Sequence, residues 1–154
     1  MSKYFYTIIL IFALFSLACN NYEKKQEEEK KKILSTQYEI FNNEYNLYCT
    51  SYVSDNIEIA KNGAERFLRI VLDLQEQGFY VPDYDKLLRL LYITLYFIED
   101  QKNNRNEAEH YFKLFIERVE ADRKPLSEIE IQERKKRINS ESREKIKKYA
   151  PWLK

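Results

Sequence analysis

The chain has 154 residues, a formal net charge of +1, 33% charged and 15% aromatic residues, and only 2 Gly and 3 Pro. Such low Gly and Pro content argues against a turn-rich all-β fold, and near-neutrality argues against general polyanion binding. The apolar content is high enough to bury a core, so most of the chain is expected to fold. Abundant Glu, Lys, Leu and Ile favour long helices.

Residues 1–18 have the layout of a secretory signal peptide. Lys3 supplies a basic start, and residues 4–17 are almost entirely apolar. A charged start, an apolar core and small residues before a cleavage point are typical of such signals. The apolar run is shorter than the ~20 residues that a membrane-spanning helix needs, so an uncleaved anchor is only the alternative.

The end of this run reads Ser16-Leu17-Ala18-Cys19 and resembles the bacterial lipobox, in which small residues precede a lipidated cysteine. The common pattern has Leu three residues before the cysteine. Here Ser16 holds that place, as in the relaxed lipoboxes of spirochaete lipoproteins. The resemblance implies cleavage before Cys19, attachment of diacylglycerol and a further acyl chain such as palmitate to Cys19, and stable anchoring in a membrane.

Residues 19–32 are expected to form a flexible charged tether behind the lipidated cysteine. The segment from Asn20 to Lys32 is polar and almost free of core residues, so burial cannot offset the entropy cost of ordering it. Glu27–Glu29 precede Lys30–Lys32 at spacings that suit ion pairs along a helix. A solvated helix is therefore an open alternative.

Residues 33–125 are predicted to form a domain of helical hairpins, because their apolar residues recur at helical spacing. A first helix is predicted over about 33–54, with an aromatic stripe. A second is predicted over about 55–77 and ends before Gly78, where a left-handed residue commonly follows a helix.

The third predicted helix, about 83–101, begins at Asp83, a plausible N-cap. It is apolar nearly all round and should therefore be the most buried helix. A polar turn separates it from a fourth helix over about 106–122, which carries a single apolar stripe.

Residues 126–154 are predicted to be a basic C-terminal helix on the surface of the domain. Ser127 and Glu130 form a capping-box pattern, and apolar positions after it are sparse. Residues 123–154 contain 11 Lys and Arg against 5 Asp and Glu, a local charge of +6. Pro151-Trp152-Leu153 is expected to clasp the end of the bundle.

The chain contains an internal repeat with an offset of 44 residues, so that Leu47 to Tyr52 aligns with Leu91 to Tyr96 with four identities in six. At this offset, three pairs of positions match the aromatic and small positions of tetratricopeptide (TPR) hairpins: Tyr48 and Tyr92, Ala64 and Ala108, and Leu68 and Phe112. The sequence resembles that family over about 40–125. Its period differs from the family's, and a plain up-down bundle of about five helices is the alternative.

Catalytic chemistry is not expected. His110 is the one histidine and has no Cys or Asp cluster around it, so neither a metal site nor a catalytic relay is predicted. The two glycines cannot form a phosphate-binding loop. We expect no cofactor, a surface or boundary place for His110, and a small buried apolar role for Cys49.

Tyrosines and one link between helices are the candidate partner contacts. Tyrosine is enriched at binding surfaces because it buries area at low entropy cost. The candidate contacts are Tyr48, Tyr52, Tyr92, Tyr96, Phe79 and Tyr80. The alternative is that these residues belong to the core, with the link plugging one end of the bundle.

These resemblances imply a non-enzymatic lipoprotein of the cell envelope, most readily of the outer membrane, facing the periplasm or the cell surface. TPR-like lipoproteins often act as scaffolds, including in outer-membrane assembly, so a protein partner is expected and nucleic acid is not. The alternative is a spirochaete-type surface lipoprotein whose basic C-terminal helix binds host molecules.

Overall fold

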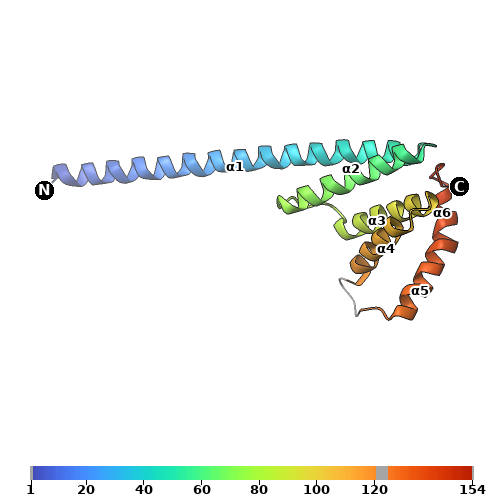
Figure 1. Cartoon of the computed structure of the whole chain (residues 1–154). Helices are drawn as coiled ribbons and strands as arrows, with labels where there is room; N and C mark the ends of the chain where they lie inside the picture. Colours follow the sequence, from blue (N-terminus) through green and yellow to red (C-terminus); the bar gives the residue numbers. More distant parts are fainter. Residues whose placement is uncertain (1, 121–124, 154) are drawn as a thin grey trace. The chain divides into compact units, whose positions relative to one another are not determined.

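The computed structural model describes the backbone of residues 2–120 and 125–153, and the side chains of residues 24–120 and 125–153. Every regular element in this part is helical, which confirms the all-α class of helical hairpins (Figure 1). The chain forms two compact units, Met1–Ile40 and Phe41–Lys154. The predicted signal peptide and Cys19 lie outside the residues whose side chains are described. Within the described part, no helix is long and apolar enough to span a bilayer.

Helix α1 (Ser2–Tyr52) begins well before residue 33, where the apolar periodicity starts. Residues 24–32 are helical with exposed side chains, and Lys31 Nζ lies 3.5 Å from Glu27 Oε1. Of the two alternatives, a flexible tether and a solvated helix, this segment is the solvated helix. Charged pairs one turn apart support a helix that has no core to pack on.

Helix α2 (Ile57–Glu76) begins at an N-cap that the sequence reading did not assign. Asn56 Oδ1 accepts hydrogen bonds from the backbone N–H groups of Glu58, at 2.9 Å, and Ile59, at 3.4 Å. Its other end confirms the prediction for Gly78, which has a φ of +80° that a residue with a side chain rarely adopts.

Helix α3 (Tyr84–Gln101) packs between α2 and helix α4 (Arg105–Glu120) (Figure 1). All residues from Leu91 to Glu99 are buried, which confirms α3 as the most buried helix. The prediction for Asp83 was wrong in its chemistry. Asp83 occupies the N-cap position, but its φ of 51° is left-handed and its side chain makes no capping bond. A capping side chain needs an extended backbone; here Asp83 Oδ1 instead accepts a bond from Lys86 Nζ at 2.9 Å.

The C-terminal helix is continuous but changes type along its length. It consists of α5 (Glu128–Arg137), a π-helical turn η1 (Ile138–Ser142) and α6 (Arg143–Lys147). The predicted capping box is confirmed, because the Ser127 side chain accepts from the Glu130 backbone while the Glu130 side chain accepts from the Ser127 backbone.

The predicted clasp at the chain end is also confirmed. Trp152 and Leu153 are buried, and Trp152 Nε1–H donates a hydrogen bond to the backbone carbonyl of Tyr52 at 2.9 Å. Gln101 Nε2 donates to the Trp152 carbonyl at 2.5 Å. The last residues therefore join the ends of α1 and α3 within the Phe41–Lys154 unit.

The two repeat halves have matching environments at two of the three pairs of TPR-like positions. Tyr48 and Tyr92 are 4% and 6% exposed, and Ala64 and Ala108 are 0% and 3% exposed. The third pair differs, because Leu68 is half-buried where Phe112 is buried, and Leu47 is 54% exposed where Leu91 is fully buried. The second hairpin is therefore covered more completely than the first.

Helices α1 and α2 pack closely at Gly63, for which no role was predicted from the sequence. A Cβ on Gly63 would lie 1.8 Å from Ser51 Oγ and 2.6 Å from Ser51 Cβ. Both distances are far inside van der Waals contact, so any side chain at residue 63 forces the two helices apart.

We therefore expect Gly63→Ala to lower the free energy of unfolding by about 1–3 kcal/mol, the usual cost of overpacking. Urea unfolding followed by circular dichroism measures the change. Asn62→Ala, at the exposed neighbouring position, is the control and should stay within about 0.5 kcal/mol of the parent. Adding Ser51→Gly to Gly63→Ala should recover part of the loss; an unchanged double variant would contradict the proposed clash.

Candidate functional site

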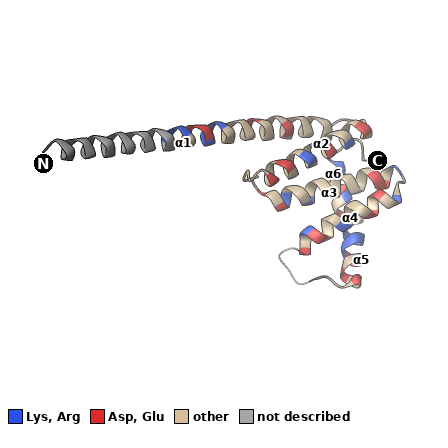
Figure 2. Cartoon of the chain, turned by 60° about the vertical axis from the view of Figure 1, so that its left-hand side comes forward, with Lys and Arg blue, Asp and Glu red and all other residues tan. Residues whose placement is uncertain are grey.

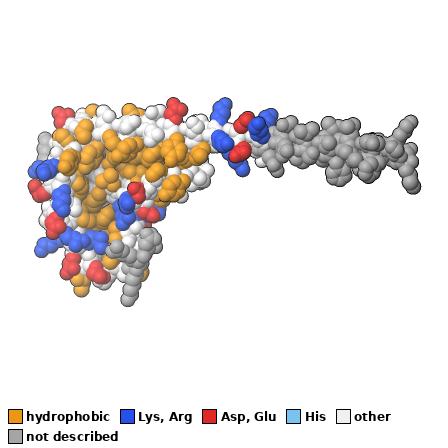
Figure 3. All heavy atoms as spheres, turned by 180° about the vertical axis from the view of Figure 1, so that it is seen from behind, with side chains coloured by type: hydrophobic (Ala, Val, Ile, Leu, Met, Phe, Trp, Pro, Cys, Tyr) orange, Lys and Arg blue, Asp and Glu red, His pale blue; other side chains and the backbone are white. Residues whose placement is uncertain are grey.

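An open apolar groove runs beside α1 in the Phe41–Lys154 unit. It has a volume of about 480 Å³. We call it the tyrosine groove, and it is lined by Tyr45, Tyr48, Cys49, Tyr52, Val53, Leu90, Lys145, Ile146 and Tyr149. An adjoining cavity of about 380 Å³ shares Tyr45 and Leu90 with it and continues toward Pro82. Figure 3 shows hydrophobic side chains gathered on one face of this unit, with Lys and Arg side chains at the margin.

Three helices build the groove. Tyr45 and Cys49 on α1, and Val53 directly after its end, are spaced four residues apart and share one face, because Val53 N–H still bonds to the Cys49 carbonyl. α3 contributes Leu90, and α6 with the turn after it contributes Ile146 and Tyr149. Several of these residues remain open to solvent; Val53 is 58% and Tyr149 68% exposed. An apolar surface of this kind on a domain commonly marks an interaction site.

The groove carries very little charge. Lys145 is its single charged lining residue, and it forms no ion pair with any residue in the described part of the chain. The adjoining cavity holds Asp83 and Lys86, which neutralise each other at 2.9 Å. The groove therefore has one uncompensated positive charge at its α6 side.

The predicted contact residues divide into three places. Tyr48 and Tyr52 line the groove, although Tyr48 is mostly buried and stacks on Phe67 with ring centroids 5.3 Å apart. Three of the candidates, Tyr92, Tyr96 and Phe79, are buried in the core. Tyr80 is 78% exposed but is not among the residues that line the groove.

The sequence reading missed Tyr45, Leu90 and the α6 wall. A signal for Tyr45 was present, since it precedes Cys49 and Val53 at one-turn intervals on an aromatic helix. Lys145 and Ile146 gave no such signal, because only the tertiary packing brings α6 beside α1.

The prediction for Cys49 was wrong. Cys49 is exposed, because the buried side of α1 is occupied by Phe41 and Tyr48, and residue 49 lies about 100° further round the helix. Its thiol meets the Tyr45 hydroxyl, and the hydrogen bond to Cys49 raises the pKa of Tyr45. Cys49 is thus a thiol accessible from the groove.

The expected surface place of His110 is confirmed, because its side chain is exposed. Among the residues that the structure describes, no group of three or more His, Cys, Asp or Glu side chains is arranged to hold a metal ion.

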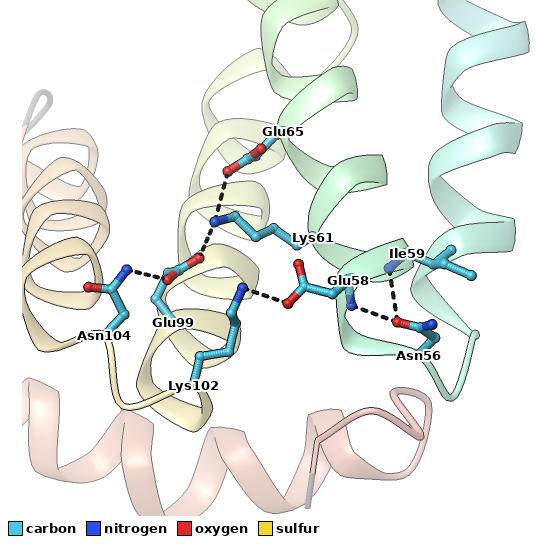
Figure 4. A network of polar contacts seen from close by, with 8 residues as sticks. All are labelled: Asn56, Glu58, Ile59, Lys61, Glu65, Glu99, Lys102 and Asn104. Carbon is cyan, nitrogen blue, oxygen red and sulfur yellow. Dashed lines mark hydrogen bonds and ion pairs between the residues drawn. The ribbon is translucent and has the colours of Figure 1, made fainter.

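A polar network joins α2, α3 and the turn that follows α3 (Figure 4). Glu99 is completely buried, and its carboxylate meets Lys61 Nζ at 2.7 Å and Asn104 Nδ2 at 2.8 Å. Lys61 also lies 3.6 Å from Glu65. The hydrogen bond to Glu99 raises the pKa of Lys61. Each charge in the network has a partner, so its role is to join helices.

Several tyrosines are buried, and their raised pKa values should make the fold less stable at high pH. Desolvation raises the pKa of Tyr48 and raises that of Tyr111 to about 12. The same cause raises the pKa values of Tyr52, Tyr92 and Tyr96. Since the unfolded chain loses these protons near pH 10, the folded state holds more protons than the unfolded state above that pH.

Stability should therefore be insensitive to these tyrosines below about pH 10 and should fall as pH rises from there toward about 12. We expect one cooperative alkaline unfolding step, in which circular dichroism and tyrosinate absorbance change together. Tyr48→Phe should make the decline with pH shallower. Full tyrosinate absorbance while the helices persist would contradict the expectation.

No protein-family model, curated protein or solved structure matches this chain. The candidate site is therefore defined by its own geometry: an apolar, tyrosine-lined groove of helical walls with one uncompensated lysine.

Proposed function

We propose that this chain is a bacterial lipoprotein, anchored to a membrane of the cell envelope through lipid on Cys19. The support is the order of its first residues: a basic start, an apolar core and the lipobox-like Ser16-Leu17-Ala18-Cys19. Replacing Cys19 with alanine should abolish incorporation of radiolabelled palmitate. Equal labelling of the Cys19→Ala variant would remove the lipid anchor from the proposal.

The anchored domain acts as a non-enzymatic protein-interaction module, a scaffold in the envelope with outer-membrane assembly as the first process to test. The observation that carries this is the tyrosine groove, an apolar surface with aromatic side chains of the kind that dominates binding energy at protein interfaces. The partner inserts a segment between α1, α3 and α6.

Photo-crosslinking in intact bacteria tests the interaction. A photoreactive amino acid replaces Val53, which lines the groove and is 58% exposed, or Ile129, which is 72% exposed and is not a groove residue. A discrete adduct from position 53 that is absent from position 129 supports the proposal. Equal adducts from both positions, or none from either, would reject a partner in the groove.

A surface role in contact with host molecules is the second candidate, and the basic end of α5 favours it (Figure 2). The last turn of α5 carries Arg134, Lys135, Lys136 and Arg137. Such a cluster attracts anionic glycans or lipid surfaces.

Protease treatment of intact cells separates the two candidates, with a periplasmic protein as the control. Loss of the domain while the control survives places it on the surface and rejects the periplasmic scaffold. Survival of both until the outer membrane is opened rejects the host-contact role.

A further inference from the structure

The walls of the tyrosine groove offer side chains but no free backbone edge. Its lining residues lie on helices or on turns that are already bonded: Val53 N–H donates to the Cys49 carbonyl at 3.4 Å and Tyr149 N–H to the Ile146 carbonyl at 2.8 Å. An extended peptide pressed against this wall would leave its own N–H and C=O groups without partners. A helix satisfies those groups internally and needs only side chains from the wall, which favours a helix over an added strand as the occupant.

The length of the wall sets the length of the occupant. From Phe41, in the adjoining cavity, to Val53, directly after the end of α1, the chain advances by about 18 Å at 1.5 Å per residue. A helix lying along this wall contacts it over about 12 residues, or three turns. One apolar stripe, at spacings of three and four residues, is enough to meet Tyr45, Tyr52 and Leu90.

The positive charge of the wall determines which charge the occupant should carry near it. Lys145 is uncompensated, whereas Lys86 is already paired with Asp83. A carboxylate on the occupant near Lys145 forms a charge-assisted bond, and a basic residue there is repelled.

Resting on the proposed function, we infer that the partner segment is an amphipathic helix of about three turns, with an apolar stripe against α1 and α3 and an acidic residue against Lys145. This is the helix-in-groove mode of recognition, with the acidic residue fixing which way the helix lies.

Cys49 supplies a reporter inside the groove. The full chain, lipidated on Cys19 and held in phospholipid nanodiscs by that lipid, leaves Cys49 as its single free thiol, since the chain has 2 Cys and the lipid occupies the Cys19 sulfur. The probes are three synthetic helical peptides of about 14 residues, longer than the contact by a few residues. One has a leucine stripe and a terminal pair of Glu, one has Lys in place of that Glu pair, and one is a scramble of the first. The rate at which a chromogenic disulfide reagent modifies Cys49 measures occupancy.

We expect the Glu peptide to slow Cys49 modification and to bind about tenfold more tightly than the Lys peptide, the ratio that one charge-assisted contact gives. Lys145→Glu should reverse this preference. Lys147→Glu, at an exposed neighbour that does not line the groove, should leave the preference in place and is the matched control.

The inference is overturned if the scrambled peptide slows Cys49 modification as much as the Glu peptide, or if Lys145→Glu leaves the preference for Glu over Lys unchanged. It is also overturned if no peptide slows the modification at about 1 mM, or if sodium dodecanoate slows it more than the Glu peptide does. The last would assign the groove to a single-chain amphiphile. Slower Cys49 modification on raising the protein concentration alone would assign it to a second copy of the chain. If peptides fail but position 53 still crosslinks a protein, the proposed function stands and only the helix inference falls.

Discussion

Replacing Trp152 with alanine is expected to lower the free energy of unfolding by about 3–5 kcal/mol, the usual cost of removing a buried tryptophan. Trp152 is 1% exposed and meets the Tyr52 ring edge-on, with centroids 5.9 Å apart and an interplanar angle of 85°. The variant loses this packing and the indole bond to the Tyr52 carbonyl. Because that carbonyl ends α1, its loss also loosens the helix that carries the groove.

Urea unfolding monitored by circular dichroism measures this effect. Trp152 is also the single tryptophan, so its fluorescence in the parent protein reports the same clasp, and the two transitions should coincide. Tyr149→Ala, at a position 68% exposed, should cost less than about 1 kcal/mol and serves as the control. A similar small cost for Trp152→Ala would mean that the chain end does not support the fold.

Replacing Lys61 with methionine should cost a comparable amount, about 3–5 kcal/mol, because it leaves the Glu99 carboxylate buried without its counter-charge. The Glu99 side chain is 0% exposed, so water cannot replace the lost partner. Asn104 remains as a single neutral donor. The Lys61 side chain is 23% exposed, which places the expected value toward the lower end of the range.

Two further variants show whether burial is the cause. Lys86→Met breaks the ion pair between Lys86 and Asp83, whose side chains are 73% and 71% exposed, respectively. It should lower the free energy of unfolding by less than about 1 kcal/mol. The double variant Lys61→Met with Glu99→Leu removes both charges and should recover most of the stability. A double variant as unstable as Lys61→Met would contradict the unpaired carboxylate as the origin of the loss.

Local sequence signals were sufficient for most of the helices. Apolar periodicity, the glycine after α2 and the capping box before α5 each act within a few residues, so they can be recognised without a partner surface. The buried stretch of α3 was also evident, because a helix that is apolar all round has to be covered on every side. The beginning of α1 was the exception, since exposed charged pairs extend it where the apolar pattern is absent.

The candidate site was less accessible to such reasoning. Tyr48 and Tyr52 were predicted as contacts because tyrosine is enriched at binding surfaces, but Tyr92 and Tyr96, predicted on the same ground and at the same spacing, lie in the core. Spacing defines a face, and only packing decides whether that face is covered. Cys49 was misplaced for this reason, and Asp83 because its left-handed backbone cannot be inferred from its residue type.

The π-helical turn η1 decides whether the groove has a third wall. Arg143 N–H bonds to the Ile138 carbonyl, so the turn takes up one residue more than an α-helical turn does. Ile131 and Ile138 are seven residues apart, about two helical turns, and therefore share a face. In an uninterrupted α-helix, position 145 would be the next residue on that face, and Ile146 would be rotated about 100° away from it. The Tyr96 hydroxyl, which donates to Asn139 Oδ1 at 2.8 Å, holds the turn against α3. A shift in phase of one residue, about 1.5 Å along the axis, thus brings Ile146 onto the face of Ile131 and Ile138 and against the same apolar cluster.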